Sequence, residues 1–226
     1  MFGLTGFGSA LITIPLATHF VPLQFALALF ALADLSGALR VGFENPKNAV
    51  KAEWIRLVPM ILVGTALGVT LLVNMPRAAG MFALGAFVFG YALYSLFRHE
   101  SGKMIAAGWA WIAGLAGGIT STVFGAGGPP YAIYLSQRGL TKEQFRATMG
   151  FATLTSISLR VVAFLLTGLL LDLKVWLVAV AVVPAAQLGI TLAQRMFLKI
   201  SREQLLRAVA VVLLAAGGSL VLRALG

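Results

Sequence analysis

The chain has 226 residues, of which 60% are hydrophobic and only 11% are charged, whereas soluble domains carry about 25% charged residues. This composition predicts an integral membrane protein. Cysteine is absent and there are two histidines, which excludes disulfides, thiolate metal sites and a histidine-rich metal site, so no metal or cofactor is expected. The net charge of +10 does not predict nucleic-acid binding, because the basic residues punctuate apolar spans as they do in helical membrane proteins.

Apolar segments follow one another along the chain, and about 20 apolar residues suffice to cross a bilayer. Capping-box patterns at Thr141–Gln144 and Ser201–Gln204 each predict the start of a helix. No alternation typical of strands is present. In chain order the predicted segments are a short broken one at 4–20, spans at 22–43, 54–75 and 77–97, a long broken one at 105–135, a helix from 141 to about 171, a span at 175–194, and a last span from 201 to about 225.

The sequence GAGGPP at residues 125–130 interrupts the long apolar segment. Glycine permits a sharp turn or a close approach to a ligand, and proline suits the first turn of a new helix. The pattern predicts two half-helices, the second covering roughly 129–136. Unwound backbone at membrane depth is tolerated only where protein buries it or where it lines a cavity. The free N–H groups of the second half-helix would attract an anion.

The two halves of the chain repeat. Blocks that begin at residues 6, 39 and 67 recur at 125, 159 and 188, which are offsets of 119, 120 and 121 residues. Internal repeats of this kind are typical of transporters, and they divide the chain into a first repeat at 1–104 and a second at 105–226. About twenty apolar residues precede the second glycine break but only five precede the first. Either the chain begins too late, or its first half-helix is missing.

The basic residues decide how the repeats are oriented. If both broken segments crossed the membrane, seven loop lysines and arginines would lie on one side and eight on the other. If both are re-entrant, twelve lie on one side and only Arg77, Lys174 and Arg223 on the other, as the positive-inside rule favours. The predicted fold is therefore an all-α polytopic membrane protein with two inverted repeats, each a re-entrant broken-helix hairpin plus three transmembrane helices.

Arg160 lies well inside a predicted span, and an intramembrane arginine is a functional hypothesis by default. Arg40 occupies the corresponding position in the first half of the chain. It lies nearer a loop, so the alternative to a functional role is that its side chain extends to the membrane interface. Asp34 is a candidate for coupling, either by carrying a proton or by pairing with a buried arginine. The candidate substrate-binding residues are Thr5, Gly6, Gly8, Ser9, Arg40, Thr122, Gly125, Gly127, Gly128, Pro129, Arg160 and Gln187. For the small polar residues among them, helix packing is the alternative.

Three blocks resemble the TauE/SafE family of membrane transporters: GLTGFGSALITIPL at 3–16, FGAGGPPYAIYL at 124–135 and RGLTKEQFRAT at 138–148. The resemblance covers essentially the whole chain and is stronger in the second half. In the first half, Ser9 and Ala10 replace glycines of the family pattern. The resemblance implies export of sulfite, sulfoacetate or related organosulfur anions across the cell inner membrane.

The expected function is thus a transporter of small sulfur-containing anions that works by alternating access, and not an enzyme. An exporter of small carboxylates is the alternative within transport. A membrane enzyme or a scaffold subunit is the alternative outside it, although the sequence has no cysteine, no His-x-x-x-His pair and no paired intramembrane carboxylates. The expected partners are the anion and the lipid bilayer, with a homodimer as a further option.

Overall fold

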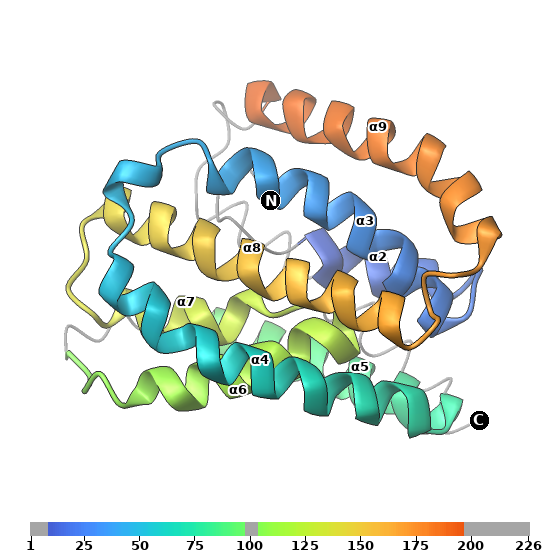
Figure 1. The fold of residues 1–226 in the computed structure, drawn as a ribbon, viewed down its shortest axis with the longest axis horizontal. Coiled ribbons are helices and arrows are strands. Elements are labelled where there is room, and N and C mark those ends of the chain that lie inside the picture. Colours follow the sequence, from blue (N-terminus) through green and yellow to red (C-terminus); the bar gives the residue numbers. More distant parts are fainter. Residues whose placement is uncertain (1–8, 98–103, 197–226) are drawn as a thin grey trace.

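The computed structural model describes residues 9–97 and 104–196, and within these ranges every regular element is a helix (Figure 1). The predicted all-α class is confirmed over this part of the chain. The first glycine break at 6–8, the capping box at Ser201 and the last predicted span lie outside the described residues. The elements are α2 (Ser9–Ala17), α3 (Leu23–Gly42), η1 (Pro46–Asn48), α4 (Lys51–Asn74), α5 (Arg77–Phe97), α6 (Trp109–Phe124), α7 (Gly128–Ser136), α8 (Lys142–Leu166) and α9 (Leu173–Met196).

Three of the described helices are long and apolar enough to cross a membrane, namely α3, α4 and α8. Shorter apolar helices lie at Ala78–Tyr91 in α5, Trp109–Phe124 in α6 and Leu173–Gly189 in α9. Large apolar side chains remain exposed on the outer faces of several helices. Such a surface suits contact with lipid chains rather than with water. Examples are Leu62, Leu67 and Leu71 on α4, Phe82 and Phe89 on α5, and Leu177, Val180 and Leu188 on α9.

Local sequence signals predicted the start of α8 correctly and its end incorrectly. The capping box at the start of α8 is confirmed, since the Thr141 hydroxyl accepts from the Gln144 N–H at 3.2 Å and the Gln144 amide oxygen accepts from the Thr141 N–H at 3.0 Å. The predicted end of this helix near residue 171 is wrong, because α8 ends at Leu166. Gly168 follows with φ of 82°, a left-handed conformation that typically ends a helix.

Helices α4 and α6 pack with their backbones in close contact. A Cβ atom on Gly64 would lie 2.3 Å from the Leu115 carbonyl oxygen, and one on Gly118 would lie 2.5 Å from the Ile61 carbonyl oxygen. Small residues at such crossings let membrane helices approach one another. This contact holds the first half of the broken segment against α4.

The two ends of the α6–α7 hairpin lie side by side. The Ile105 N–H donates to the Gln137 carbonyl at 3.2 Å, and Arg138 Nη1 donates to the Ile105 carbonyl at 2.5 Å. The chain therefore returns to the end of the bundle at which α6 begins. The Arg146–Glu44 ion pair, at 2.7 Å, brings the loop after α3 to the same end, which is on the left in Figure 1.

The core of the molecule surrounds the tip of this hairpin. Ile14 of α2, Leu27 of α3, Phe124 of α6 and Phe164 of α8 are buried in one apolar cluster. Phe124 also stacks on Phe87 of α5, with ring centroids 5.0 Å apart. The helix break thus lies inside the protein, where α2, α3, α5 and α8 converge on it.

Candidate functional site

The helix break predicted at residues 125–130 is present between α6 and α7. Gly125 ends α6 in the left-handed region, with φ of 70° and ψ of 10°, and the Ala126 N–H bonds to the Thr120 carbonyl at 3.0 Å. A Cβ atom on Gly125 would lie 2.2 Å from Ile14 Cδ1 and 3.2 Å from Arg160 Nη1. This glycine is therefore needed both for its backbone conformation and for the space that Ile14 and Arg160 occupy.

Gly127 is required for space alone. Its φ of −72° and ψ of −17° are right-handed, so any residue could adopt them. A Cβ atom there would lie 2.8 Å from both the Gly117 carbonyl oxygen and Ser121 Cβ, and 3.2 Å from Ser156 Oγ. Gly128 and Pro129 are also buried in the first turn of α7. The break is therefore packed directly against α6 and α8.

Arg160 of α8 is fully buried beside this break. Its Nη1 donates to the Ser121 carbonyl at 2.9 Å, and its Nη2 donates to Asp34 Oδ2 at 2.9 Å. Among the residues that the structure describes, its Nε has no hydrogen-bond partner. A buried guanidinium N–H without a partner is rare. This N–H is therefore able to donate to a further oxygen.

Asp34 of α3 is the acidic partner of this arginine. It is 7% exposed, and its ion pair with Arg160 joins the first half of the chain to the second. Of the two roles considered for Asp34, pairing with a buried arginine is therefore observed. Removing either partner of such a pair would leave an uncompensated buried charge.

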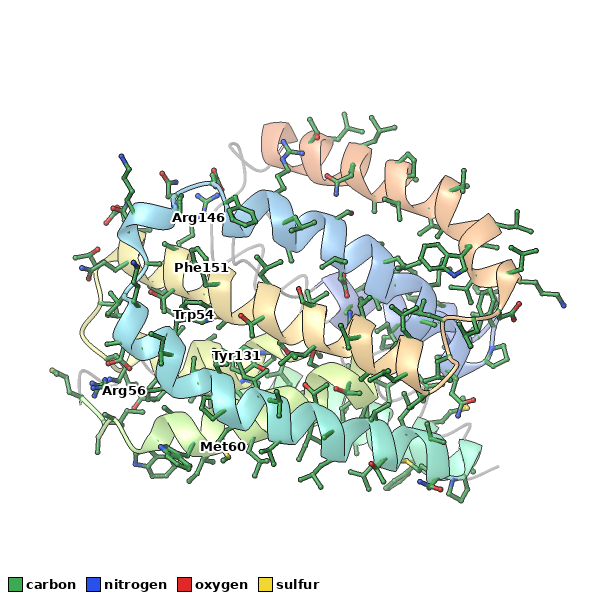
Figure 2. All side chains as sticks on the ribbon, in the orientation of Figure 1. Trp54, Arg56, Met60, Tyr131, Arg146 and Phe151 are labelled. Carbon is green, nitrogen blue, oxygen red and sulfur yellow. The ribbon has the colours of Figure 1, made fainter. Side chains whose placement is uncertain are left out.

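Tyr131 and Ser156 complete the polar lining, and neither was singled out from the sequence. The buried Tyr131 hydroxyl donates to Ser156 Oγ at 3.0 Å. The Tyr131 ring fills the notch at Gly117, where a Cβ atom would lie 2.0 Å from it. Figure 2 shows Tyr131 in the interior of the bundle. Ser156 precedes Arg160 by four residues and shares its helix face, a spacing that could have identified it.

Other predicted site residues take part in different contacts. The exposed Arg40 donates from Nη1 to Thr191 Oγ1 at 3.2 Å, and Gln187 Nε2 donates to Ser36 Oγ at 2.7 Å. Both contacts link α3 to α9. The buried Thr122 hydroxyl donates to the Gly118 carbonyl at 2.9 Å within α6. Ser9 begins α2, and Thr5, Gly6 and Gly8 lie outside the described residues.

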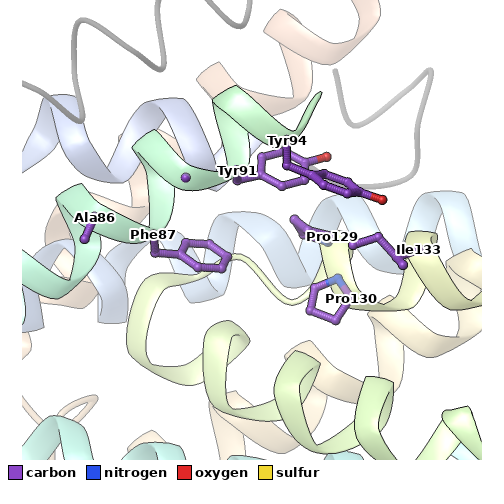
Figure 3. Close-up of a pocket in the computed structure, with 8 residues that line it drawn as sticks. Ala86, Phe87, Tyr91, Tyr94, Pro129, Pro130 and Ile133 are labelled. Atoms are coloured by element: carbon purple, nitrogen blue, oxygen red, sulfur yellow. The ribbon is translucent and has the colours of Figure 1, made fainter. Parts of the chain in front are cut away.

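A cavity of about 320 Å³ lies between α5 and the first turn of α7 (Figure 3). Pro129 and Pro130 form its α7 side, and aromatic rings from α5 face them. It reaches the two prolines that follow the helix break. The residues that line it are Ala86, Phe87, Gly90, Tyr91, Tyr94, Pro129, Pro130 and Ile133.

A second polar cluster holds the ends of the hairpin. Glu53 of α4 is 5% exposed and accepts from Arg138 Nη2 at 2.9 Å, from Arg56 Nη1 at 2.7 Å and from the Tyr134 hydroxyl. The hydrogen bond to the Glu53 carboxylate raises the pKa of the Arg138 guanidinium above its ordinary value, so this cation stays charged. Within residues 9–97 and 104–196, no group of three acidic or histidine side chains could hold a metal ion.

Comparison with known proteins gives two matches. The sulfite exporter TauE/SafE family matches residues 1–220. The chain is also 26% identical over 196 residues to the probable inner membrane transporter protein TsaS of Comamonas testosteroni, with 85% of this chain and 81% of that protein covered. No solved structure matches significantly.

These matches agree with the apolar helices of the structure. A family of membrane transporters matches nearly the whole chain, and three described helices are long and apolar enough to span a bilayer. The protein is a multi-pass membrane transporter of the cell inner membrane. The chain belongs to the sulfite exporter TauE/SafE family.

Proposed function

We propose that the protein exports small sulfur-containing anions, such as sulfite, sulfoacetate or related sulfonates, by alternating access, and that Arg160 is the main ligand of the anion. The observation that carries this proposal is the position of Arg160. Its guanidinium is fully buried beside the break at Gly125 and keeps an Nε–H without a partner among the described residues. A buried guanidinium whose Nε–H has no described partner is a favourable binding group for an oxyanion.

The donors at the break favour an arginine-centred site over one made by helix N–H groups alone. Pro129 and Pro130 have no backbone N–H. The first turn of α7 therefore has only the glycine N–H groups at 127 and 128 to offer, together with its partial positive charge. Arg160 supplies a full charge and a planar set of donors, which matches the oxygens of a sulfonate or sulfite.

Two sets of contacts support the re-entrant, inverted-repeat topology. The ends of the α6–α7 hairpin meet at Ile105 and Gln137, and Arg138 reaches Glu53 from the same end. In addition, α4 packs on α8 while α9 packs on α3. If α3 corresponds to α8 and α4 corresponds to α9, the contact of α4 with α8 in one repeat has its equivalent in the contact of α9 with α3. Both contacts are expected from a two-fold relation between the repeats. Such a topology places the helix break near the middle of the membrane.

Export of a small carboxylate is the second candidate function. Arg160 already binds a carboxylate, that of Asp34, at 2.9 Å. A guanidinium fork accepts the two oxygens of a carboxylate as readily as two oxygens of a sulfonate. Selectivity between them would come from the third sulfonate oxygen, for which the N–H groups of Gly127 and Gly128 and the Ser156 hydroxyl are candidate donors at the break.

Flux into proteoliposomes tests the proposal. The purified protein would be assayed with sulfite, sulfoacetate, taurine, sulfate and lactate. Ligand binding would be followed by thermal stabilisation, which reaches about 2.7 kcal/mol at a hundredfold excess over Kd. We expect sulfite or a sulfonate to move and to stabilise the protein. Movement of lactate alone would favour the carboxylate exporter, and movement of none of the five would remove the proposed function.

Matched variants would connect the flux to Arg160. Lys174→Ala removes an exposed cation in the first turn of α9, which is not among the candidate site residues, and should keep transport. Arg160→Gln combined with Asp34→Asn removes both charges of the buried pair together, so it avoids an uncompensated buried charge. This double variant should fold and lose transport. Full transport by a folded double variant would show that the anion binds elsewhere.

A further inference from the structure

We propose that Thr153 of α8 binds the anion on its way from the cytoplasmic end of the bundle to Arg160, so that Thr153 and Ser156 form an uncharged binding position before the arginine. This inference rests on the proposed function and adds the route of the anion to it. It begins from hydrogen-bond donors on one face of α8 that the fold buries and leaves unused.

Thr153, Ser156 and Arg160 follow one another on the same face of α8, at spacings of three and four residues. All three are buried. At the rise of an α-helix, Thr153 lies about 10 Å from Arg160 along the axis, with Ser156 between them. Thr153 lies toward Lys142, where α8 begins. An anion that comes from that end along this face therefore meets Thr153 before the arginine.

The Thr153 hydroxyl differs from most threonine hydroxyls in the helices of this protein. A threonine within a helix can donate to the carbonyl of the residue four positions earlier. Thr153 is 6% exposed, and its Oγ1 has no hydrogen-bond partner among the described residues. A buried polar group without a partner is costly and rare. The threonines that do donate to their own helix in this way are Thr70, Thr120, Thr122, Thr155, Thr167 and Thr191.

Ser156 connects Thr153 to the arginine. Its Oγ accepts from the Tyr131 hydroxyl at 3.0 Å, and no acceptor for its own O–H is found in the described part of the chain. Arg160 Nε–H is also without a described partner. Unused donors in a row suit a ligand that only accepts hydrogen bonds, as an ionised oxyanion does. Because Ser156 borders both positions, the anion can pass to Arg160 without losing all its hydrogen bonds at once.

The end of the bundle from which Thr153 is reached is basic. Lys47, Lys51 and Lys142 are exposed there, and the positive-inside rule assigns this end to the cytoplasm. A basic surface raises the local concentration of anions. Uncharged hydroxyls would then bind the anion weakly enough to let it move on to the guanidinium, since conduction requires positions that an ion can also leave.

Apolar packing separates Thr153 from that end in this structure. Met149 lies one turn before Thr153 on α8 and is buried in a cluster with Tyr134 and Leu135 of α7. The anion therefore reaches Thr153 only when α7 and α8 separate at this point. Such an opening on one side of the membrane is the motion that alternating access requires.

Thr153→Val is the main test, because valine keeps the shape of the side chain and removes only the hydroxyl. Sulfite and sulfoacetate are the probes, with flux measured from the cytoplasmic face and binding measured by thermal stabilisation. We expect the initial rate at low anion concentration to fall about tenfold or more, the effect of losing a hydrogen bond to a charged group. The affinity at Arg160 should be unchanged. Without the anion, the variant should melt no lower than the wild type, because the hydroxyl that it loses has no partner.

Thr155→Val is the matched control on the same helix. The Thr155 hydroxyl donates to the Phe151 carbonyl at 2.9 Å and accepts from Trp54 Nε1 at 3.0 Å. Its loss should lower the melting temperature and leave the rate of transport unchanged, which is the opposite of both effects expected for Thr153→Val. Thr153→Ser, which restores a hydroxyl at this position, should recover the wild-type rate.

Cysteine protection tests the route without relying on the rate of transport. The native chain has no cysteine, so Thr153→Cys provides a single thiol. A thiol reagent that carries a sulfonate should react with it from the cytoplasmic side, and sulfoacetate should slow that reaction. Thr155→Cys, two residues away on a different face of α8, should show no protection by sulfoacetate.

Each failure has a distinct meaning. If Thr153→Val moves both anions at the wild-type rate, the route is wrong and the proposed function stands. A lower melting temperature together with a rate that Thr153→Ser does not recover would assign Thr153 a structural role and would also overturn the inference. If the wild type moves neither anion, the proposed function itself fails. If Thr153→Val does not fold, protection of Thr153→Cys decides the question, and its absence overturns the inference.

Discussion

Arg160 of α8 and Asp34 of α3 are 126 positions apart in the chain and meet in a buried ion pair at 2.9 Å. The pair lies against the carbonyl of Ser121 and the left-handed Gly125. It therefore joins the two halves of the chain at the point where the α6–α7 hairpin is broken. Any motion of one half against the other changes the surroundings of this pair.

The first prediction concerns this ion pair. Arg160→Ala should lower the free energy of unfolding by about 3–5 kcal/mol, because it leaves Asp34 buried without its cation. Arg160→Lys should cost less, since it retains the charge but loses the planar fork. Thermal unfolding in detergent measures both. Adding Asp34→Asn to Arg160→Ala should recover part of the stability, and a double variant no more stable than Arg160→Ala would contradict the pairing.

The second prediction concerns Gly125. Gly125→Ala should destabilise the protein, because an L-residue pays about 1–2 kcal/mol in the left-handed region. In addition, the new Cβ would lie 2.2 Å from Ile14 Cδ1. Gly189→Ala is the control, since that glycine is exposed on α9 with nothing within 4 Å of a Cβ atom. Equal melting temperatures for the two variants would show that the turn at Gly125 tolerates a side chain.

The third prediction concerns Gly127, where the obstacle is space rather than backbone conformation. Gly127→Val should abolish stabilisation by the anion. Its Cβ atom would lie 2.8 Å from the Gly117 carbonyl oxygen and from Ser121 Cβ, and 3.2 Å from Ser156 Oγ, so the side chain would fill the space beside the break. Because a Cβ atom at 127 would lie 2.8 Å from the Gly117 carbonyl oxygen, the variant should also melt at a lower temperature than the wild type. Anion stabilisation is therefore compared at a temperature at which both proteins are folded and monodisperse in detergent. Normal anion binding by this variant would mean that the break is structural only.

Features encoded by neighbouring residues could be predicted from the sequence, and features made by distant residues could not. The break at GAGGPP and the capping box at Thr141 depend on the local chemistry of glycine, proline and threonine. The end of α8 was missed because apolar residues continue past Gly168 and hide it. For Asp34 the sequence predicted pairing with a buried arginine as one of two roles, but it did not identify Arg160 as the partner, and the partners of Glu53 were not predicted at all. A single sequence does not show which distant charge a buried carboxylate meets after folding.

The fourth prediction concerns the topology of the hairpin. Because the native chain has no cysteine, single cysteines can be introduced directly. Cysteines at Met104 and Ser136, both exposed, should react with a membrane-impermeant reagent from the cytoplasmic side. A cysteine at Leu171, exposed between α8 and α9, should react from the opposite side. Reaction of Met104 and Ser136 from opposite sides would restore a simple crossing for this segment.

The last prediction concerns Glu53, which binds both Arg56 and Arg138 and accepts from the Tyr134 hydroxyl. Glu53→Gln should lower the free energy of unfolding by about 1.5–3 kcal/mol, the range for losing a hydrogen bond to a charged group. The Arg146–Glu44 pair provides the matched control, because both of its side chains are nearly half exposed. Glu44→Gln should therefore cost about 1 kcal/mol or less.

Cysteine reactivity at Ser136 would show where the effect of Glu53→Gln arises. Arg138 joins Glu53 to the Ile105 carbonyl, and so to the start of α6. Losing this link should free the end of α7 and speed labelling at position 136, whereas Glu44→Gln should leave that rate unchanged. If Glu53→Gln destabilises the protein without changing labelling, the cluster stabilises α4 alone and does not fasten the ends of the hairpin.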